Sequence, residues 1–172
     1  MFYKNIFSVL VLCGFVILYL IIPYTIFASE EKLVIAHRGA SGYIPEHTLE
    51  SSVLAYAMKA DYLELDVVMT SDRHLIIMHD LTLNGTTNVD EIFPNRSGTN
   101  GKHFTMEFSL AEVKRLRVHE RSNKRGSGPA FIGRFPYESS IFEVPTLEEI
   151  LKLVKGLKKS HGRTMGLYIE IK

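Results

Sequence analysis

The fold of this 172-residue chain is decided by residues 33–70, which read LVIAHRGASGYIPEHTLESSVLAYAMKADYLELDVVMT. Residues 33–36 form a short apolar run that predicts a strand, and a loop rich in glycine follows. Apolar residues at helical spacing then predict a helix over residues 48–59, and residues 62–70 predict a second strand. Apolar strands that alternate with helices are typical of parallel βαβ units covered on both faces.

The rest of the chain continues this alternation. Short apolar runs at residues 75–78 and 165–172 predict two further strands. Capping boxes of the form Ser/Thr-x-x-Glu predict helices over about residues 109–118 and 146–157. The order of these elements favours a parallel sheet with helices packed on it.

A long insertion separates the third strand from the last helix. Residues 88–102 and 119–143 are rich in Gly, Asn, Pro and basic residues, so the insertion is expected over about residues 84–143. Four strands with their helices are half of a (β/α)₈ barrel, a fold that typically needs about 250 residues. The sequence therefore predicts an α/β fold that is either a small open sheet or the N-terminal part of a TIM barrel ending after its fourth strand.

Barrel strands are buried on both faces, and we expect this around Leu33, Leu65 and Ile169. The first and last strands of a half-barrel would have unpaired edges and exposed apolar surface. We therefore expect residues 29–172 to be poorly soluble or to self-associate, and to be inactive, when expressed alone.

Residues 1–28 form a region of their own. No charged residue lies between Asn5 and Ser29, and Lys4 is the only charge before them. This uncharged run is longer than the apolar core of a signal peptide, which usually has roughly 7–15 residues. It reaches the roughly 20 residues that a helix needs to span a bilayer. We expect either a cleaved signal peptide or a retained membrane anchor, with residues 29–172 exported and membrane contact limited to this segment.

Composition excludes several classes of protein. The chain is 46% hydrophobic and 23% charged, which is typical of a packed globular domain and excludes wholesale disorder. A formal net charge of +1 provides no strong field for a phosphate backbone, so we expect no nucleic-acid partner. The single cysteine excludes an intramolecular disulfide and a cysteine-based metal cluster.

Three carboxylates are candidates for a metal site. Glu64 and Asp66 are two residues apart in a predicted strand, so they project side by side from one face. Adjacent carboxylates repel unless a cation lies between them, and hard oxygen ligands select Mg²⁺ or Ca²⁺. Glu170, between two isoleucines of the last strand, is a candidate third ligand. The competing interpretation places Glu64 and Asp66 in solvent on an edge strand.

Histidines and cations follow other predicted strands. His37 ends the first strand and His79 the third, and both are candidate proton carriers. Arg38 and Lys172 can hold an anionic phosphate, or they can pair with ordinary acids. Ligands of α/β proteins bind beyond strand ends, so these groups together suggest metal-assisted phosphodiester hydrolysis. We expect the remaining histidines to lie on the surface: His47, His74, His103, His119 and His161.

A family resemblance rests on five motifs. They are Ala36-His37-Arg38-Gly39-Ala40-Ser41-Gly42, Pro45-Glu46-His47-Thr48, Glu64-Leu65-Asp66, His79-Asp80 and Glu170-Ile171-Lys172. From about residue 33 to its end, the chain resembles the glycerophosphodiester phosphodiesterase family. The insertion and Gly133-Arg134-Phe135-Pro136 resemble its exported, periplasmic branch. Many members have a basic residue where Gly85 stands.

The resemblance implies a TIM barrel with a small insertion and hydrolysis of glycerophosphodiesters to glycerol 3-phosphate and an alcohol. It implies that His37 and His79 are the acid/base pair and that Arg38 and Lys172 bind the phosphate. Glu64, Asp66 and Glu170 would bind one divalent cation, Ca²⁺ or Mg²⁺. The location would be the periplasm, or the inner membrane for an anchored form. The alternative is a truncated, non-catalytic surface or binding protein that is exported or membrane-anchored.

Overall fold

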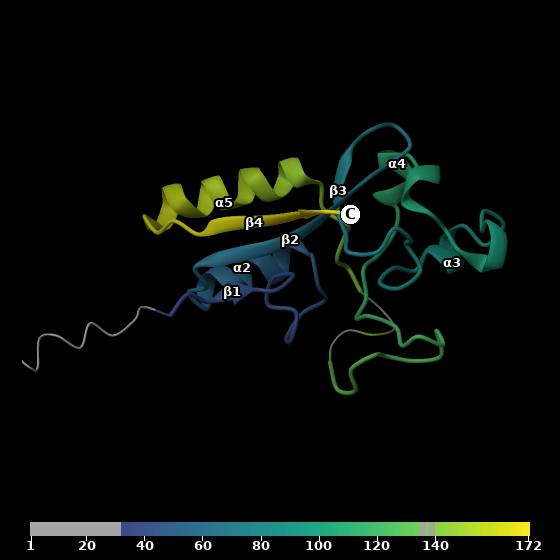
Figure 1. Cartoon of the computed structure of the whole chain (residues 1–172), viewed down its shortest axis with the longest axis horizontal. Helices are drawn as coiled ribbons and strands as arrows, with labels where there is room; N and C mark the ends of the chain where they lie inside the picture. The colour runs from purple at the N-terminus through teal and green to yellow at the C-terminus, as the bar shows by residue number, and fades with distance from the viewer. Residues whose placement is uncertain (1–31, 135–136, 138–139) are drawn as a thin grey trace, which may run out of the picture. The chain divides into compact units, whose positions relative to one another are not determined.

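The computed structural model describes residues 32–134, 137 and 140–172 (Figure 1). The expected signal peptide or anchor at residues 1–28 lies outside the described residues. In the part that is described, no helix combines the length and apolar character needed to cross a membrane. The strands are β1 (Ile35–Ala36), β2 (Tyr62–Met69), β3 (Leu75–Ile77) and β4 (Gly166–Ile171). The helices are α2 (Leu49–Ala57), α3 (Val89–Ile92), α4 (Leu110–Val113) and α5 (Leu147–His161), with short 3₁₀ turns at Thr99–Gly101 and Thr105–Glu107.

The centre of the sheet is β2, with a parallel partner on each side. Tyr62 is paired with Ile35 of β1 and also with Gly166 of β4. The pairing with β4 continues to Val67, which lies opposite Ile171. The predicted parallel βαβ arrangement is confirmed for these three strands.

The third strand differs from the prediction because β3 pairs with β2 in the antiparallel sense. Only a tight turn separates the two strands, closed by a 2.9 Å hydrogen bond from the Thr70 N–H to the His74 carbonyl. A parallel connection needs a dozen residues or more, so this short link can only return as a hairpin. The described sheet therefore has three parallel strands, not four, and β3 is not a barrel strand of the predicted kind.

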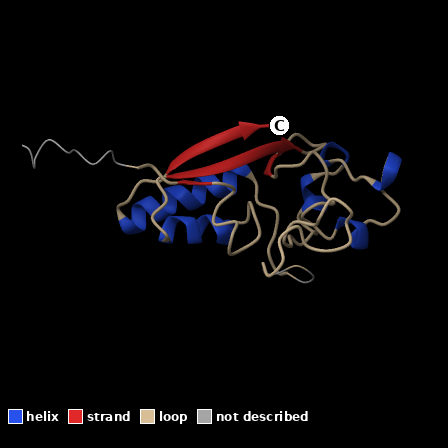
Figure 2. Cartoon of the chain, turned by 60° about the horizontal axis from the view of Figure 1, so that its bottom comes forward, coloured by secondary structure: helices blue, strands red, loops and turns tan. Residues whose placement is uncertain are grey.

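Helices α2 and α5 cover one face of the sheet (Figure 2). Leu63, Leu65 and Val67 alternate along β2 and are buried in the core beneath these helices. Helix α5 begins at its expected cap, Thr146, and α2 is capped by Thr48; each of these side chains accepts a hydrogen bond from the third residue beyond it. Helix α5 extends four residues beyond its predicted end, as far as the left-handed cap at Gly162.

The insertion has a hydrophobic core of its own. Phe108 is fully buried at its centre, packed with residues from the end of β2, from β3 and from α4. The Ser109 capping box is confirmed, but α4 is shorter than predicted, since turns replace helix after Val113. The predicted loop at residues 88–102 contains the single turn of α3. The insertion is thus a packed unit rather than a loose loop.

Of the strands around Leu33, Leu65 and Ile169, only β2 is buried on both faces. Leu65 is fully buried, as expected, but Leu33 before β1 is 63% exposed and Ile171 of β4 is 89% exposed. Ile169 is also exposed, so the expectation is wrong for the two outer strands. The apolar side chains of β1 and β4 lie along the open edges of the described sheet.

Candidate functional site

The polar face of β2 carries the first two candidate ligands. Because Leu63, Leu65 and Val67 point into the core, Glu64 and Asp66 project from the opposite face of the strand. Both are nonetheless buried, at 5% and 1% exposure, which excludes the solvent-facing interpretation. The parallel register then places residue 170 of β4 directly beside Asp66.

The three predicted metal ligands converge. One carboxylate oxygen from each of Glu64, Asp66 and Glu170 lies within 4.8 Å of the other two. The Oδ1 atom of Asp66 is buried and has no hydrogen-bond partner. Three carboxylates with a buried oxygen left over match the hard oxygen donors that Mg²⁺ and Ca²⁺ prefer. These residues therefore fit a divalent cation.

Lys172 lies between two of these ligands. Its Nζ is 2.8 Å from Asp66 Oδ1 and 2.8 Å from Glu170 Oε2, although only the contact with Glu170 has hydrogen-bond geometry. The contacts with both carboxylates raise the pKa of Lys172. Burial would raise the pKa of Asp66, but contacts from His47 and Lys172 outweigh it, so this pKa lies well below its usual range. Lys172 pairs with acids here, and its role in phosphate binding stays a prediction.

Arg38 lies in the tight loop after β1. Its backbone is in the left-handed region, with φ of 60°, and its N–H donates a 2.7 Å hydrogen bond to Glu64 Oε2. Gly39 follows with φ of 82°, and a Cβ there would lie 2.4 Å from Ser51 Oγ, so only glycine fits. The Arg38 side chain bonds Glu46 at 3.0 Å and places Nε 3.6 Å from Asp66. This strained loop therefore joins Arg38 to the carboxylates.

His47 is a site residue that the sequence analysis missed. It is 4% exposed rather than on the surface, and its Nε2 lies 2.9 Å from Asp66 Oδ2. An ionised Asp66 can only accept, so His47 Nε2–H donates this bond. His47 also has a left-handed backbone, with φ of 62°, which turns its ring toward β2. The prediction of a surface position is wrong for His103 as well, which is fully buried and bonds the Phe93 carbonyl at 3.0 Å.

His79 reaches the site through the hairpin rather than from a parallel strand. The N–H of Met78 donates to the Asp66 carbonyl at 3.0 Å, so the chain after β3 returns beside the ligands. His79 Nδ1 lies 2.6 Å from Asp80 Oδ1. His37, at the end of β1, is exposed and makes no side-chain hydrogen bond among the described residues, and its catalytic role stays a prediction.

Three further charged residues, Glu46, Asp80 and Arg121, lie beside the candidate ligands and are paired with one another. Arg121 comes from the insertion and bonds both Glu46 and Asp80. Glu46 lies three residues before the start of α2 and pairs with two arginines, Arg38 and Arg121. The position of Asp80 directly after His79 was a signal for its role, whereas nothing in the sequence pointed to Arg121.

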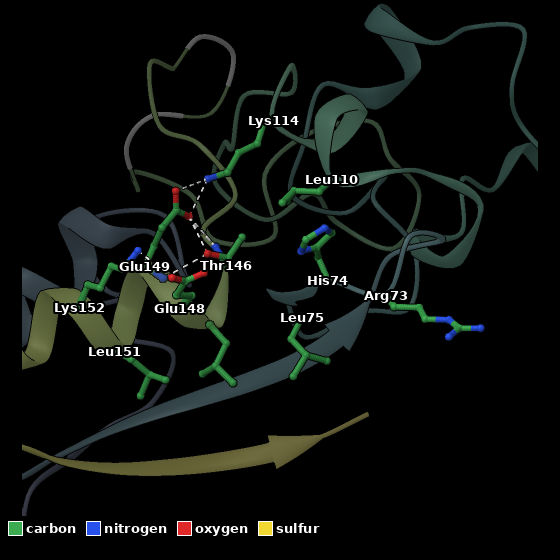
Figure 3. A pocket seen from close by; sticks show the side chains of 11 residues that line it. Arg73, His74, Leu75, Leu110, Lys114, Thr146, Glu148, Glu149, Leu151 and Lys152 are labelled. Carbon is green, nitrogen blue, oxygen red and sulfur yellow. Dashed lines mark hydrogen bonds and ion pairs between the residues drawn. The ribbon is translucent and has the colours of Figure 1, made fainter.

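Among the described residues, no other group of acids converges as these three ligands do. Figure 3 shows a pocket beside the first turn of α5, between β3 and α4, where Glu149 pairs with Lys114 and Glu148 with Lys152. None of the predicted site residues lines this pocket. Its carboxylates serve the capping box and the helix surface, so the pocket lies outside the candidate site.

Comparisons with known proteins agree with the geometry. The model of the glycerophosphoryl diester phosphodiesterase family matches residues 37–172. A glycerophosphodiester phosphodiesterase from Haemophilus influenzae is 43% identical over 146 residues, which are 84% of this chain and 40% of the relative. One from Treponema pallidum is 39% identical over 84% of this chain and 41% of the relative. The chain therefore belongs to the glycerophosphoryl diester phosphodiesterase family.

Solved structures show the same fold. A glycerophosphoryl diester phosphodiesterase from Silicibacter pomeroyi matches with a TM-score of 0.65 and 29% identity, over 81% of this chain and 45% of that one. An Oleispira antarctica phosphodiesterase in complex with the product sn-glycerol-3-phosphate matches with a TM-score of 0.56 and 29% identity, over 82% of this chain and 44% of that one. The chain has the α/β architecture of this TIM-barrel family, and it spans less than half the length of these relatives.

Proposed function

We propose that this protein hydrolyses glycerophosphodiesters to glycerol 3-phosphate and an alcohol in a reaction that depends on a divalent cation. The observation that carries the proposal is the convergence of the buried Glu64 and Asp66 with the exposed Glu170, beside Arg38 and Lys172. Membership of the family supports this reaction class, as does the product bound to the Oleispira antarctica relative.

The cationic side chains would hold the substrate phosphate. Arg38 presents a planar guanidinium at the rim of the carboxylate cluster, with its buried Nε free of a hydrogen-bond partner. A guanidinium of this kind matches two phosphate oxygens at once. Lys172 would add a point charge after it leaves Asp66 and Glu170.

His37 and His79 would move the protons. One histidine takes the proton from the attacking hydroxyl, which in this proposal is the substrate's own glycerol hydroxyl. The other donates a proton to the oxygen of the departing alcohol, so that a cyclic phosphate forms and water then opens it. Asp80 orients His79 by accepting from its Nδ1–H at 2.6 Å.

Glu64, Asp66 and Glu170 would hold one Ca²⁺ or Mg²⁺ ion. When bound, such a cation neutralises charge that develops on the phosphoryl oxygens. Lys172 Nζ lies against two of the three ligands, so it must move aside when they bind the cation. The same displacement frees its ammonium for the substrate.

We also propose export, on the basis of the uncharged run from Asn5 to Ser29. The protein would work in the periplasm, or at the inner membrane if this segment is retained. The proposed partner is a small-molecule glycerophosphodiester, and nucleic acid is not expected.

The test is a coupled assay of glycerol 3-phosphate release from glycerophosphocholine, run on this chain and on a version extended by a second half-barrel, because residues 29–172 alone are expected to be inactive. We expect excess chelator to abolish release and added Ca²⁺ or Mg²⁺ to restore it. Glu64→Gln should remove activity, whereas Glu148→Gln, an exposed acid paired only with Lys152, should not. Undiminished hydrolysis in excess chelator would contradict the proposal.

A second candidate function is a non-catalytic exported or anchored binding protein. It is favoured by the exposed apolar side chains of β1 and β4, which offer a binding surface along the sheet edges. The same assay separates the two, because a binding protein would take up the cation without any release of glycerol 3-phosphate. That outcome would replace the hydrolytic proposal.

A further inference from the structure

We propose that Arg121, supplied by the insertion, is the positioning residue that sets His79 and Arg38 for the reaction. This inference rests on the proposed function, since it assigns the supporting contacts of the same site. It means that the insertion takes part in the chemistry through one side chain, rather than only covering the sheet.

The guanidinium of Arg121 bonds two acids at once. Its Nε and Nη2 lie 2.9 and 2.6 Å from the two oxygens of Glu46, a bidentate arrangement. Its Nη1 lies 2.7 Å from Asp80 Oδ2. The side chain is only 20% exposed, so water competes little for these bonds. One rigid fork therefore fixes the spacing between Glu46 and Asp80.

The first branch of this network leads to His79. Burial would raise the pKa of Asp80, but Arg121 and His79 outweigh it, and the pKa is lowered. An ionised Asp80 only accepts hydrogen bonds, so the 2.6 Å contact requires the proton on His79 Nδ1. Nε2 has no hydrogen-bond partner among the described residues and is the ring atom left for proton transfer. Arg121 holds Asp80 in the orientation that selects this tautomer.

The second branch leads to Arg38. Glu46 Oε1, which lies 2.6 Å from Arg121, also accepts from Arg38 Nη1 at 3.0 Å. Two arginines thus share one buried carboxylate. Without Arg121, Glu46 would lose its bidentate partner and could turn, carrying Arg38 away from the carboxylate cluster.

The backbone is shaped to deliver Arg121 to this position. Ser122 N–H donates to the Gly85 carbonyl at 2.8 Å, which fastens the insertion to the turn after His79 and Asp80. A Cβ on Gly85 would lie 2.8 Å from Asp80 Oδ2 and 3.5 Å from Arg121 Nη1. A side chain at position 85 would therefore make the Asp80 carboxylate shift from its present place beside Arg121.

The test uses ¹⁵N nuclear magnetic resonance of the histidine rings in the full chain, solubilised in detergent micelles and assigned with His79→Ala. We expect the wild-type His79 to show a protonated Nδ1, an unprotonated Nε2 and a downfield Nδ1–H signal. In Arg121→Gln, the downfield signal should be lost and the two tautomers should mix. Arg121→Lys should retain part of the signal. Arg117→Gln, at an insertion arginine that contacts Glu143, is the matched control and should match the wild type.

Unchanged His79 signals in Arg121→Gln would overturn the inference. Gly85→Ala is a second test of the inference. It should disturb the same His79 signals although Arg121 itself is unchanged. These readouts need no turnover, so they stand even if the chain hydrolyses nothing. Where hydrolysis is measured, Arg121→Gln should lower kcat by about 10–100-fold, as loss of supporting contacts does at comparable sites, with circular dichroism unchanged.

Discussion

Carboxylates and lysines lie together both on the polar face of β2 and at the first turn of α5. The two regions differ in how the carboxylates are paired and how deeply they are buried. At α5, Glu149 accepts the Thr146 N–H of its capping box and bonds Lys114 Nζ at 2.7 Å. On β2, Asp66 is 1% exposed and has an oxygen without a hydrogen bond, although Lys172 lies beside it. The acids of α5 are partly exposed and paired with lysines. Those of β2 are buried, and one oxygen of Asp66 has no hydrogen-bond partner.

The difference separates a structural cluster from a ligand site. The start of a helix is stabilised by negative charge and by a cap, and Glu149 provides both. Its carboxylate is therefore already in use and is not available as a metal ligand. Burying Glu64 and Asp66 side by side costs free energy that an apolar strand would avoid. The fold retains that cost on the face where Arg38, His47 and His79 also converge. The convergence of acids from neighbouring strands, rather than acidic composition, therefore marks the site.

The largest expected effect comes from the proposed proton carriers, His37 and His79. His37→Ala or His79→Ala should each lower kcat by about 10²–10⁴-fold, the usual worth of a positioned acid or base. KM should change much less, because the proposal assigns the phosphate to Arg38 and Lys172. The measurement is the steady-state rate of glycerol 3-phosphate release.

His161→Ala is the control for these variants. His161 ends α5, where its ring lies 6.0 Å from that of Tyr56, and it should be near neutral. Equal losses at His37 and His161 would show that the site has been misplaced.

A smaller effect is expected at Lys172, the residue that links the β2 cluster to β4. Lys172→Met removes the ammonium that competes for Asp66 and Glu170, so Ca²⁺ should bind about tenfold more tightly, the equivalent of one charge-assisted hydrogen bond. KM should rise because a phosphate contact is lost. Calorimetry and kinetics measure the two effects, and Lys152→Met on α5 should change neither. Weaker Ca²⁺ binding in Lys172→Met would contradict the proposed displacement.

The smallest effect is expected at α5. Burial would raise the pKa of Glu149, but Lys114 and the Thr146 N–H outweigh it, so the folded-state pKa lies below its ordinary value of 4.5. The stabilisation is therefore present above that value and is lost as pH falls through the folded-state pKa. Glu149→Gln should lower the free energy of unfolding by about 0.3–1 kcal/mol at neutral pH. Denaturant titrations should show wild type and variant converging in acid, and a gap that widens in acid would rule out this assignment.

Much of the site could be predicted because its residues alternate along a strand or follow the end of one. The alternation around Glu64 and Asp66, with apolar neighbours, predicted one polar face. The motif ending in Lys172 predicted the third ligand, and the parallel register then placed Glu170 beside Asp66. The capping boxes predicted where α4 and α5 begin because that signal is local.

The errors lie where local pattern carries no information. Alternation does not give strand direction, so the pattern predicts a parallel β3, whereas the short turn before it requires an antiparallel hairpin. His47 was assigned to the surface because loops usually are exposed, and only its left-handed backbone turns the ring onto Asp66. Arg121 meets Glu46 across 75 positions of sequence, a contact created by the packing of the insertion.

The most direct test is isothermal titration of Ca²⁺ into the metal-free full chain and two variants, one from each carboxylate cluster. We predict one binding site per chain in the wild type and in Glu149→Gln. In Asp66→Asn, which alters the cluster of Glu64, Asp66 and Glu170, Ca²⁺ affinity should fall by more than about 10²-fold, beyond the loss of an outer-shell partner. Equal Ca²⁺ binding by Asp66→Asn and Glu149→Gln, or no binding by the wild type, would contradict the assignment of the β2 face as the cation site.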